Sequence, residues 1–180
     1  MATASNWYIP VAKTKLTIYQ ITLFAMLGAL TFALKWVMSW IPNIEPVTLM
    51  VLIFGAVFGW KAIFPLYIYV AMELLYYGFG YWNICYLYIW LVPLILGIVC
   101  RKMESPLGWA VAAGSFGLAF GGLCAIVNIF IGGIGYAVAW WINGVFHDLL
   151  HCVGNFVIAL VLFVPLRKLV EKLYRSGPLH

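Results

Sequence analysis

Residues Ala137–Pro165 carry the sequence AVAWWINGVFHDLLHCVGNFVIALVLFVP. This run is almost wholly apolar and is longer than the roughly 20 residues that a helix needs to cross a bilayer, so it predicts a transmembrane helix. Four polar residues interrupt it at steps of four: Asn143, His147, His151 and Asn155. Residues at that spacing lie on one side of a helix. Because an ionisable group at membrane depth costs about 2.5–3.5 kcal/mol on insertion scales, the stripe is expected to face protein, water or a ligand.

The composition of the whole chain indicates a polytopic membrane protein. Of its 180 residues, 66% are hydrophobic and 8% are charged, and the mean hydropathy is +1.06. A soluble domain of this size could not bury so much apolar surface, whereas the long apolar runs can cross a bilayer as helices. The net charge of +5 does not indicate nucleic-acid binding, because the basic residues lie at the ends of apolar runs, where they set membrane topology.

The predicted fold class is an all-α membrane protein with six transmembrane helices, forming a single domain over residues 1–180. Gly and Pro turn signals separate the apolar runs. The expected spans are Leu16–Trp40, Val47–Trp60, Ala62–Tyr77, Trp82–Cys100, Leu107–Ile131 and Ala137–Pro165. The first run is too long for a signal peptide and is interpreted as the first span.

The distribution of positive charge predicts that both termini are cytoplasmic. With six spans, every Lys and Arg except Lys35 falls on the inner side, as the positive-inside rule requires. If the second and third spans were one helix, Arg101 and Lys102 would lie outside, so six spans are preferred. Residues 1–15 and 166–180 are then a cytoplasmic N-terminal segment and a cytoplasmic tail.

The membrane-embedded ionisable residues all fall in the outer half of this topology. A proton pump or an ion channel needs a polar path across the whole membrane, so one-sided polarity favours a blind pocket open to the outside. Many aromatic residues in spans three and four, and at the start of span six, suit a flat organic ligand. The predicted substrate-binding residues are Lys35, Asn43, Glu45, Glu73, Tyr77, Trp82, Asn83, Tyr86, Asn143, His147, His151 and Asn155.

Two structural alternatives stay open for these residues. Lys35 lies near a helix end, where a lysine often extends its ammonium toward the interface. The two histidines could instead bond to neighbouring helices.

The segment His147-Asp148-Leu149-Leu150-His151 resembles the zinc motif His-Glu-x-x-His. Its acid is one methylene shorter than Glu, and Glu73 is the only reasonable third ligand, so an intramembrane zinc hydrolase is the least favoured reading. A divalent-metal transporter that uses Glu73, His147, Asp148 and His151 is a stronger alternative. The favoured interpretation has no resident metal or cofactor, and Asp148 is expected to turn partly away from the pocket.

Small residues form a stripe along the first span, at Ala25, Ala29 and Ala33. Such a stripe allows another helix to approach closely. A second ladder in span five (Ala113, Gly117, Gly121 and Ala125) is enough to pack the bundle internally, so the first stripe is free to serve as an external docking surface.

Taken together, these features resemble the substrate-binding S-component of energy-coupling factor (ECF) transporters. Members of that family are small, apolar proteins of six spans, and Ala25, Ala29 and Ala33 match their Ala-x-x-x-Ala motif. The segments around Asn43–Val47 and Asn143–Asn155 also look like those of the family.

The resemblance implies a non-enzymatic protein of a prokaryotic plasma membrane that captures a vitamin, a vitamin precursor or a metal ion. Its implied partners are a transmembrane coupling subunit, which docks on the Ala stripe, and two cytoplasmic ATPases. The chain itself has no G-x-x-x-x-G-K phosphate-binding motif. Cobalamin, with a histidine near its cobalt, and smaller ring vitamins both remain candidate substrates, and so does a purely structural role without a ligand.

Overall fold

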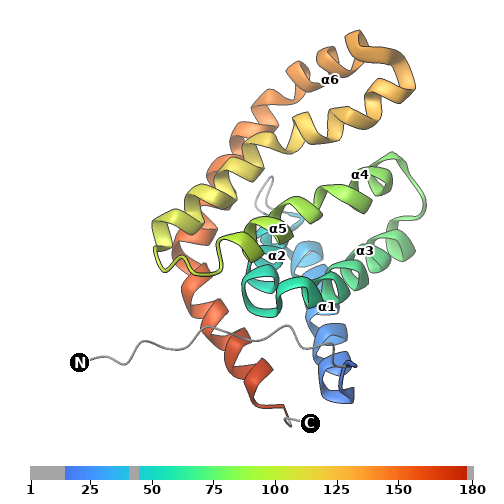
Figure 1. Ribbon diagram of the computed structural model, residues 1–180. Helices are drawn as coiled ribbons and strands as arrows, with labels where there is room; N and C mark the ends of the chain where they lie inside the picture. The colour runs from blue at the N-terminus through green and yellow to red at the C-terminus, as the bar shows by residue number, and fades with distance from the viewer. Residues whose placement is uncertain (1–14, 41–44, 178–180) are drawn as a thin grey trace.

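The computed structural model describes residues 15–40 and 45–177, and its regular structure over these residues is helical throughout (Figure 1). The elements are α1 (Ile18–Met38), α2 (Pro46–Phe58), the short 3-10 helix η1 (Gly59–Ala62), α3 (Ile63–Tyr77), α4 (Tyr81–Ile89), α5 (Leu91–Val99) and α6 (Pro106–Arg175). The all-α prediction therefore holds for the described residues.

Local sequence explains where these helices begin and end. The Thr17 hydroxyl accepts a hydrogen bond from the Gln20 N–H at 3.2 Å and caps α1. Ser105 caps α6 in the same way through the Gly108 N–H, at 3.1 Å. Gly59 and Gly78 follow α2 and α3 with φ of 59° and 78°, a conformation that side chains with a Cβ rarely adopt.

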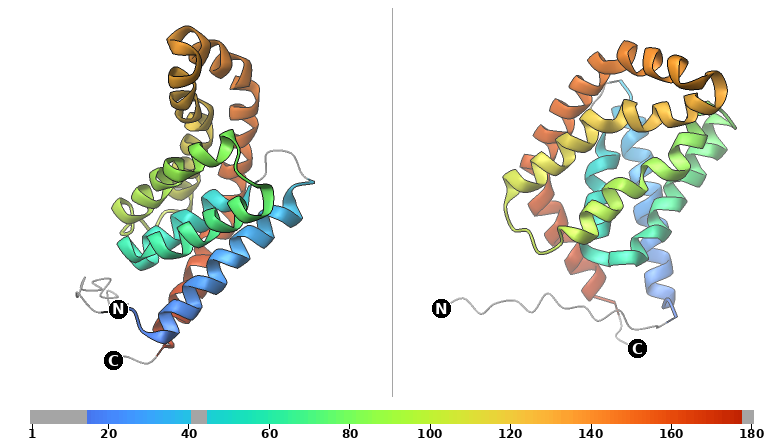
Figure 2. Two further views of the ribbon diagram at one scale, coloured as in Figure 1. Left: turned by 90° about the vertical axis from the view of Figure 1, so that its right-hand side faces the viewer. Right: turned by 45° about the horizontal axis from the view of Figure 1, so that its top comes forward.

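The long α6 is interrupted once, at Gly133. Its φ of 81° and ψ of 178° are not helical, and the ribbon doubles back near this point, so that α6 forms two arms (Figures 1 and 2). We call residues 106–132 the first arm and residues 134–175 the second arm. The turn falls inside the glycine-rich break that separates the fifth and sixth expected spans.

Four helical stretches are long and apolar enough to cross a membrane: Ile18–Met38, Pro46–Tyr77, Trp82–Val99 and Pro106–Arg175. They are consistent with a membrane-embedded protein. The second stretch joins α2, η1 and α3, and α2 alone is about 20 Å long at 1.5 Å per residue, which is shorter than the roughly 30 Å hydrocarbon core. Six complete spans thus stay a prediction.

The centre of the molecule is α2, of which every residue is buried. It packs against α5, α6 and α1. Its contact with α5 is a backbone crossing, since a Cβ on Gly55 would collide with the Leu94 carbonyl and one on Gly97 with the Leu52 carbonyl. Small residues at such a crossing let two apolar helices approach closely.

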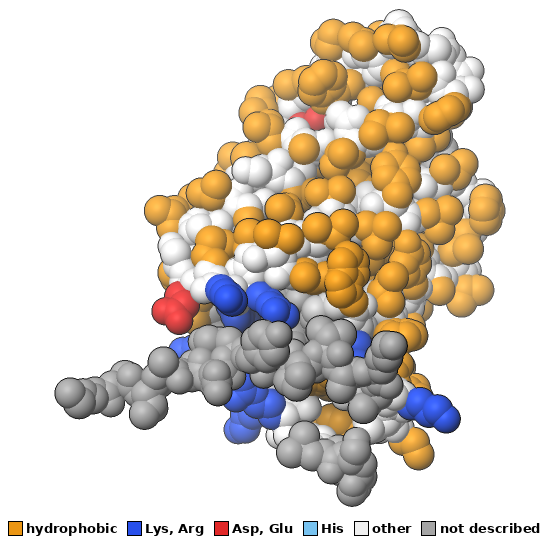
Figure 3. Space-filling view, viewed as in Figure 1, with side chains coloured by type: hydrophobic (Ala, Val, Ile, Leu, Met, Phe, Trp, Pro, Cys, Tyr) orange, Lys and Arg blue, Asp and Glu red, His pale blue; other side chains and the backbone are white. Residues whose placement is uncertain are grey.

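The two ends of the molecule differ in charge. Figure 3 shows Lys and Arg side chains gathered toward the end where α6 terminates, while hydrophobic side chains cover most of the remaining face. The start of α1 lies at the same basic end, because the Tyr19 hydroxyl donates to the Leu173 carbonyl at 2.6 Å. The described chain therefore starts and finishes at one end, although the side of the membrane that this end occupies stays a prediction.

Candidate ligand pocket

A cavity of about 430 Å³ lies between α4, the two arms of α6 and the residue that precedes α2. This volume lies within the usual range for small-molecule sites. The cavity is lined by Glu45, Trp82, Tyr86, Phe120, Gly121, Trp140, Gly144, His147, Asp148 and His151. Five of the twelve predicted binding residues are among them, namely Glu45, Trp82, Tyr86, His147 and His151.

The second arm of α6 presents a different stripe to the cavity from the predicted one. Its lining residues Gly144, His147, Asp148 and His151 follow the i, i+3, i+4, i+7 pattern of one helical face. Steps of exactly four residues drift by about 40° each at 3.6 residues per turn. The drift turns Asn143 about 90° from the centre of the lining face, whereas Asn155 stays on that face, seven residues from Asp148, but lies one turn further along the helix than His151.

The two asparagines at the ends of that stripe are accordingly not among the lining residues. Asn143 is exposed. Asn155 is buried, and its Nδ2 donates to the Thr48 hydroxyl of α2 at 3.2 Å. Asn155 thus connects two helices.

Glu45 and His151 form the polar end of the cavity. The Nε2 of His151 lies 3.7 Å from the Oε2 of Glu45, and the imidazole is 6% exposed and packs against the Phe120 ring at 4.9 Å. Neither atom of this pair has a hydrogen-bond partner within the described part of the chain. Burial alone would raise the pKa of the Glu45 carboxyl, but its interactions with His151 and Lys35 outweigh burial and hold that pKa below its usual value.

Asp148 lines the cavity and links the two arms of α6. Its Oδ1 accepts a hydrogen bond from the Gly121 N–H at 2.9 Å, and a Cβ on residue 121 would overlap the carboxylate. The sequence-based expectation turned Asp148 partly away, whereas the structure places it in the lining. The signal that could have identified it is the three-residue spacing from His151, which is as close on a helical face as the spacing of four.

Lys35 and Glu73 do not line the cavity, but Lys35 contacts a residue that does. The Lys35 ammonium donates to Glu73 Oε2 at 2.8 Å and to the Tyr86 hydroxyl at 3.1 Å, and Tyr86 lines the cavity. Lys35 side-chain exposure is 16% and that of Glu73 is 4%. The lysine is therefore held in a largely buried ion pair and is not extended freely toward the interface.

The remaining predicted binding residues lie outside the lining. The ring of Tyr77 is exposed and its centroid lies 5.9 Å from the Lys35 ammonium. Asn83 Oδ1 accepts from the Gly80 N–H at 2.9 Å and so caps α4. Asn43 falls outside the described residues. Trp140 was not among the predicted binding residues, yet it lines the cavity, and its ring contacts that of Trp82 with the centroids 5.9 Å apart.

The metal alternative required Glu73 to join His147, Asp148 and His151. Across residues 15–40 and 45–177, no group of three or more His, Cys, Asp or Glu side chains is placed to hold one ion. Glu73 is bound to Lys35 instead. The structure therefore does not bring these four ligands together.

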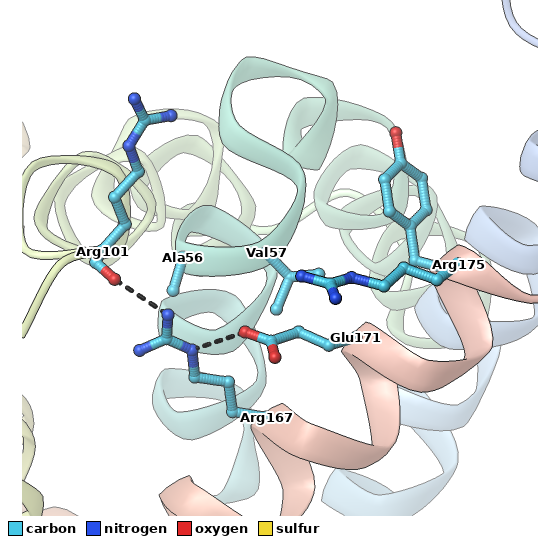
Figure 4. Close-up of a pocket in the computed structure, with 7 residues that line it drawn as sticks. Ala56, Val57, Arg101, Arg167, Glu171 and Arg175 are labelled. Carbon is cyan, nitrogen blue, oxygen red and sulfur yellow. Dashed lines mark hydrogen bonds and ion pairs between the residues drawn. The ribbon is translucent and has the colours of Figure 1, made fainter. Parts of the chain in front are cut away.

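The basic end contains a small cavity of a different kind. Figure 4 shows Arg167 between the Glu171 carboxylate and the Arg101 carbonyl, and these hydrogen bonds are each 2.8 Å long. The space beside them is about 30 Å³, room for a water molecule or two but not for an organic ligand. A larger groove nearby, of about 260 Å³, is lined mainly by charged residues. The aromatic ligand-sized cavity thus lies away from the basic end.

Comparison with known proteins finds no matching family, no similar curated protein and no similar solved structure.

Proposed function

We propose that this chain is the membrane-embedded substrate-binding subunit of an importer, of the S-component type, and that it captures a small organic micronutrient. The observation that carries the proposal is the cavity of about 430 Å³, lined by aromatic rings and a few converging polar groups, with no Lys or Arg among the described lining residues. Aromatic walls with a few polar anchors are typical of sites for small organic ligands. With the basic end inside, the cavity belongs to the outer half of the membrane.

The size of the cavity favours a ligand of one or two rings. A cavity of this volume holds most of a drug-sized molecule, whereas a corrin such as cobalamin is several times larger. Trp82 and Trp140, whose rings contact each other at 5.9 Å, also form an aromatic wall against which a flat heterocycle can pack. We therefore favour a small ring vitamin, or a precursor of one, over cobalamin.

Transport in this proposal depends on other chains. The coupling subunit and the two ATPases of an ECF-type importer would supply the energy, and the lipid bilayer would surround the rest of the apolar surface. The Ala stripe of α1 supports such docking, since Ala25 and Ala33 are exposed and Ala29 is half-buried. A stripe that faces outward is available to a partner helix. The proposed location is the plasma membrane of a prokaryote.

Native mass spectrometry of the detergent-purified chain tests the proposal. We expect a small organic molecule to co-purify with the wild-type protein and to be lost from the Trp82→Ala variant. Trp60→Ala is the matched control, because Trp60 is similarly exposed (59% against 51%) and does not line the cavity. Stoichiometric zinc without an organic ligand, or equal ligand retention by both variants, would overturn the proposal.

A further inference from the structure

The half of the molecule that contains the cavity has more negative than positive side chains. Glu45, Glu73 and Asp148 are its described carboxylates, and Lys35 is its described lysine. The ammonium of Lys35 binds Glu73 at 2.8 Å. Buried charges in proteins are usually paired, but among the described residues Glu45 faces only the His151 imidazole at 3.7 Å and Asp148 accepts from the Gly121 N–H, so neither carboxylate is bonded to a Lys or an Arg there.

Both of these carboxylates line the cavity, and no described lining residue is a Lys or an Arg. Glu45 Oε2 and Asp148 Oδ2 are buried atoms without a hydrogen-bond partner among the described residues, and Asp148 as a whole is 4% exposed. A buried carboxylate oxygen without a partner carries a penalty of about 1–3 kcal/mol or more. A donor that enters the cavity with the ligand would remove this penalty.

The other lining residues are suited to the same charge. Trp82, Phe120 and Trp140 supply three aromatic rings, and a fourth lining ring, Tyr86, already has the Lys35 ammonium 4.8 Å from its centroid. The face of an aromatic ring is negative, so it attracts an ammonium or another organic cation within about 6 Å, and most strongly where water is excluded. Trp faces are the best of these, and aromatic cages of this kind recognise alkylated ammonium groups.

We propose that the cavity binds an organic cation, with a positively charged nitrogen near the Glu45 and Asp148 carboxylates and the ring system against the wall formed by Trp82 and Trp140. This inference rests on the proposed function, because it names the chemical class of the ligand for the same site. His147 and His151 supply further hydrogen-bonding groups on the α6 side of the cavity. An anionic ligand would meet two carboxylates without a facing Lys or Arg.

Three probes of one size and three charges test the proposal: benzylammonium, benzyl alcohol and benzoate. Each is titrated into the purified protein, and the dissociation constant is obtained from the rise in melting temperature, since a ligand that binds only the folded state stabilises it. We expect benzylammonium to bind at least tenfold more tightly than benzyl alcohol and benzoate to be the weakest. Ca²⁺ alone is a fourth arm and is expected to give no shift.

The variant Glu45→Gln separates charge from shape. It keeps the side-chain size but removes the carboxylate, so we expect about a tenfold or greater loss of benzylammonium affinity with little change for benzyl alcohol. Glu104→Gln is the matched control: it makes the same chemical change at an exposed residue that does not line the cavity. We expect wild-type affinities from it. The melting temperature without ligand shows whether Glu45→Gln is folded. If this variant does not fold, the order of affinities of the three probes for the wild-type protein still tests the proposal.

The outcomes of these experiments distinguish the organic-cation proposal from the proposed substrate-binding function on which it rests. Equal binding of all three probes, tightest binding of benzoate, or a larger shift with Ca²⁺ would overturn the organic-cation proposal. An anionic or neutral organic molecule that co-purifies and is lost from Trp82→Ala would do the same while supporting a binding subunit. No shift with any probe, together with no co-purified molecule, would overturn both.

Discussion

Lys35 illustrates how one side chain links the ligand pocket to the stability of the bundle. Its ammonium bonds to the Glu73 carboxylate and to the Tyr86 hydroxyl, so three helices, α1, α3 and α4, meet at one charge. Tyr86 also lines the cavity, so this contact connects the ion pair to the pocket. An ion pair in such a setting offsets the desolvation of its members, but removal of one partner leaves a buried charge without compensation.

We therefore expect Lys35→Met to lower the free energy of unfolding by about 3 kcal/mol or more, the range for breaking a buried pair. Thermal or denaturant unfolding of the purified protein measures the loss. The double variant Lys35→Met/Glu73→Gln should recover much of it, because neither side chain then carries a charge. Lys172→Met, at an exposed position of the basic end, should stay near wild type. A Lys35→Met protein as stable as wild type would show that the pair contributes nothing.

The crossing of α2 and α5 is the tightest helix contact of the core. Because Gly55 and Gly97 face backbone carbonyls of the opposite helix, an added methyl group must push the two backbones apart. We expect Gly97→Ala to destabilise the protein by about 1–3 kcal/mol, as overpacking does. The melting temperature in detergent measures this effect.

Gly135→Ala is the control for that crossing, since a Cβ there meets no atom within 4 Å. Alanine has the higher helix propensity, so Gly135→Ala should be neutral or stabilising by up to about 1 kcal/mol. Equal melting temperatures for the two variants would mean that the crossing tolerates separation.

The outward stripe of α1 carries a prediction that depends on the proposed partners. Ala25→Phe and Ala33→Phe place bulk on exposed positions, so we expect the fold and ligand binding to be retained. Close helix approach would be blocked, and cellular uptake of the ligand found by mass spectrometry should fall at least tenfold. Val157→Phe is the control, because Val157 is 52% exposed but lies on α6, away from the stripe. Normal uptake with both Ala variants would exclude the stripe as the docking face.

At the scale of the whole molecule, the described chain starts and ends at the basic end, and the ligand-sized cavity lies away from it. This arrangement predicts a sidedness that labelling can measure. In a variant without the four native cysteines, a cysteine at Phe79, in the exposed α3–α4 connection, should react with a membrane-impermeant maleimide added to intact cells. A cysteine at the exposed Ser176 should react only after lysis. The reverse pattern would place the basic end outside.

Several features of this fold are local and were therefore predictable. The helical class follows from apolar runs that must satisfy their own backbone hydrogen bonds in lipid, and the Gly133 turn lies in the break expected between Gly132 and Gly135. The predicted binding residues coincide with the cavity lining only in part. The stripe at steps of four contains His147 and His151, but Asn143 is turned off the lining face, Asn155 lies one turn beyond it against Thr48, and Asp148 is in the lining.

Local physics accounts for the helices, for their caps and breaks, and for the presence of costly polar groups in apolar runs. Tertiary packing set which of these groups meet. It paired Lys35 with Glu73, 38 residues away, and set Glu45 beside His151. It also placed Asp148 against Gly121 on the opposite arm of α6. Such contacts depend on how the helices rotate and cross, which is set by the packing of all of them at once, and no spacing within one segment contains that information.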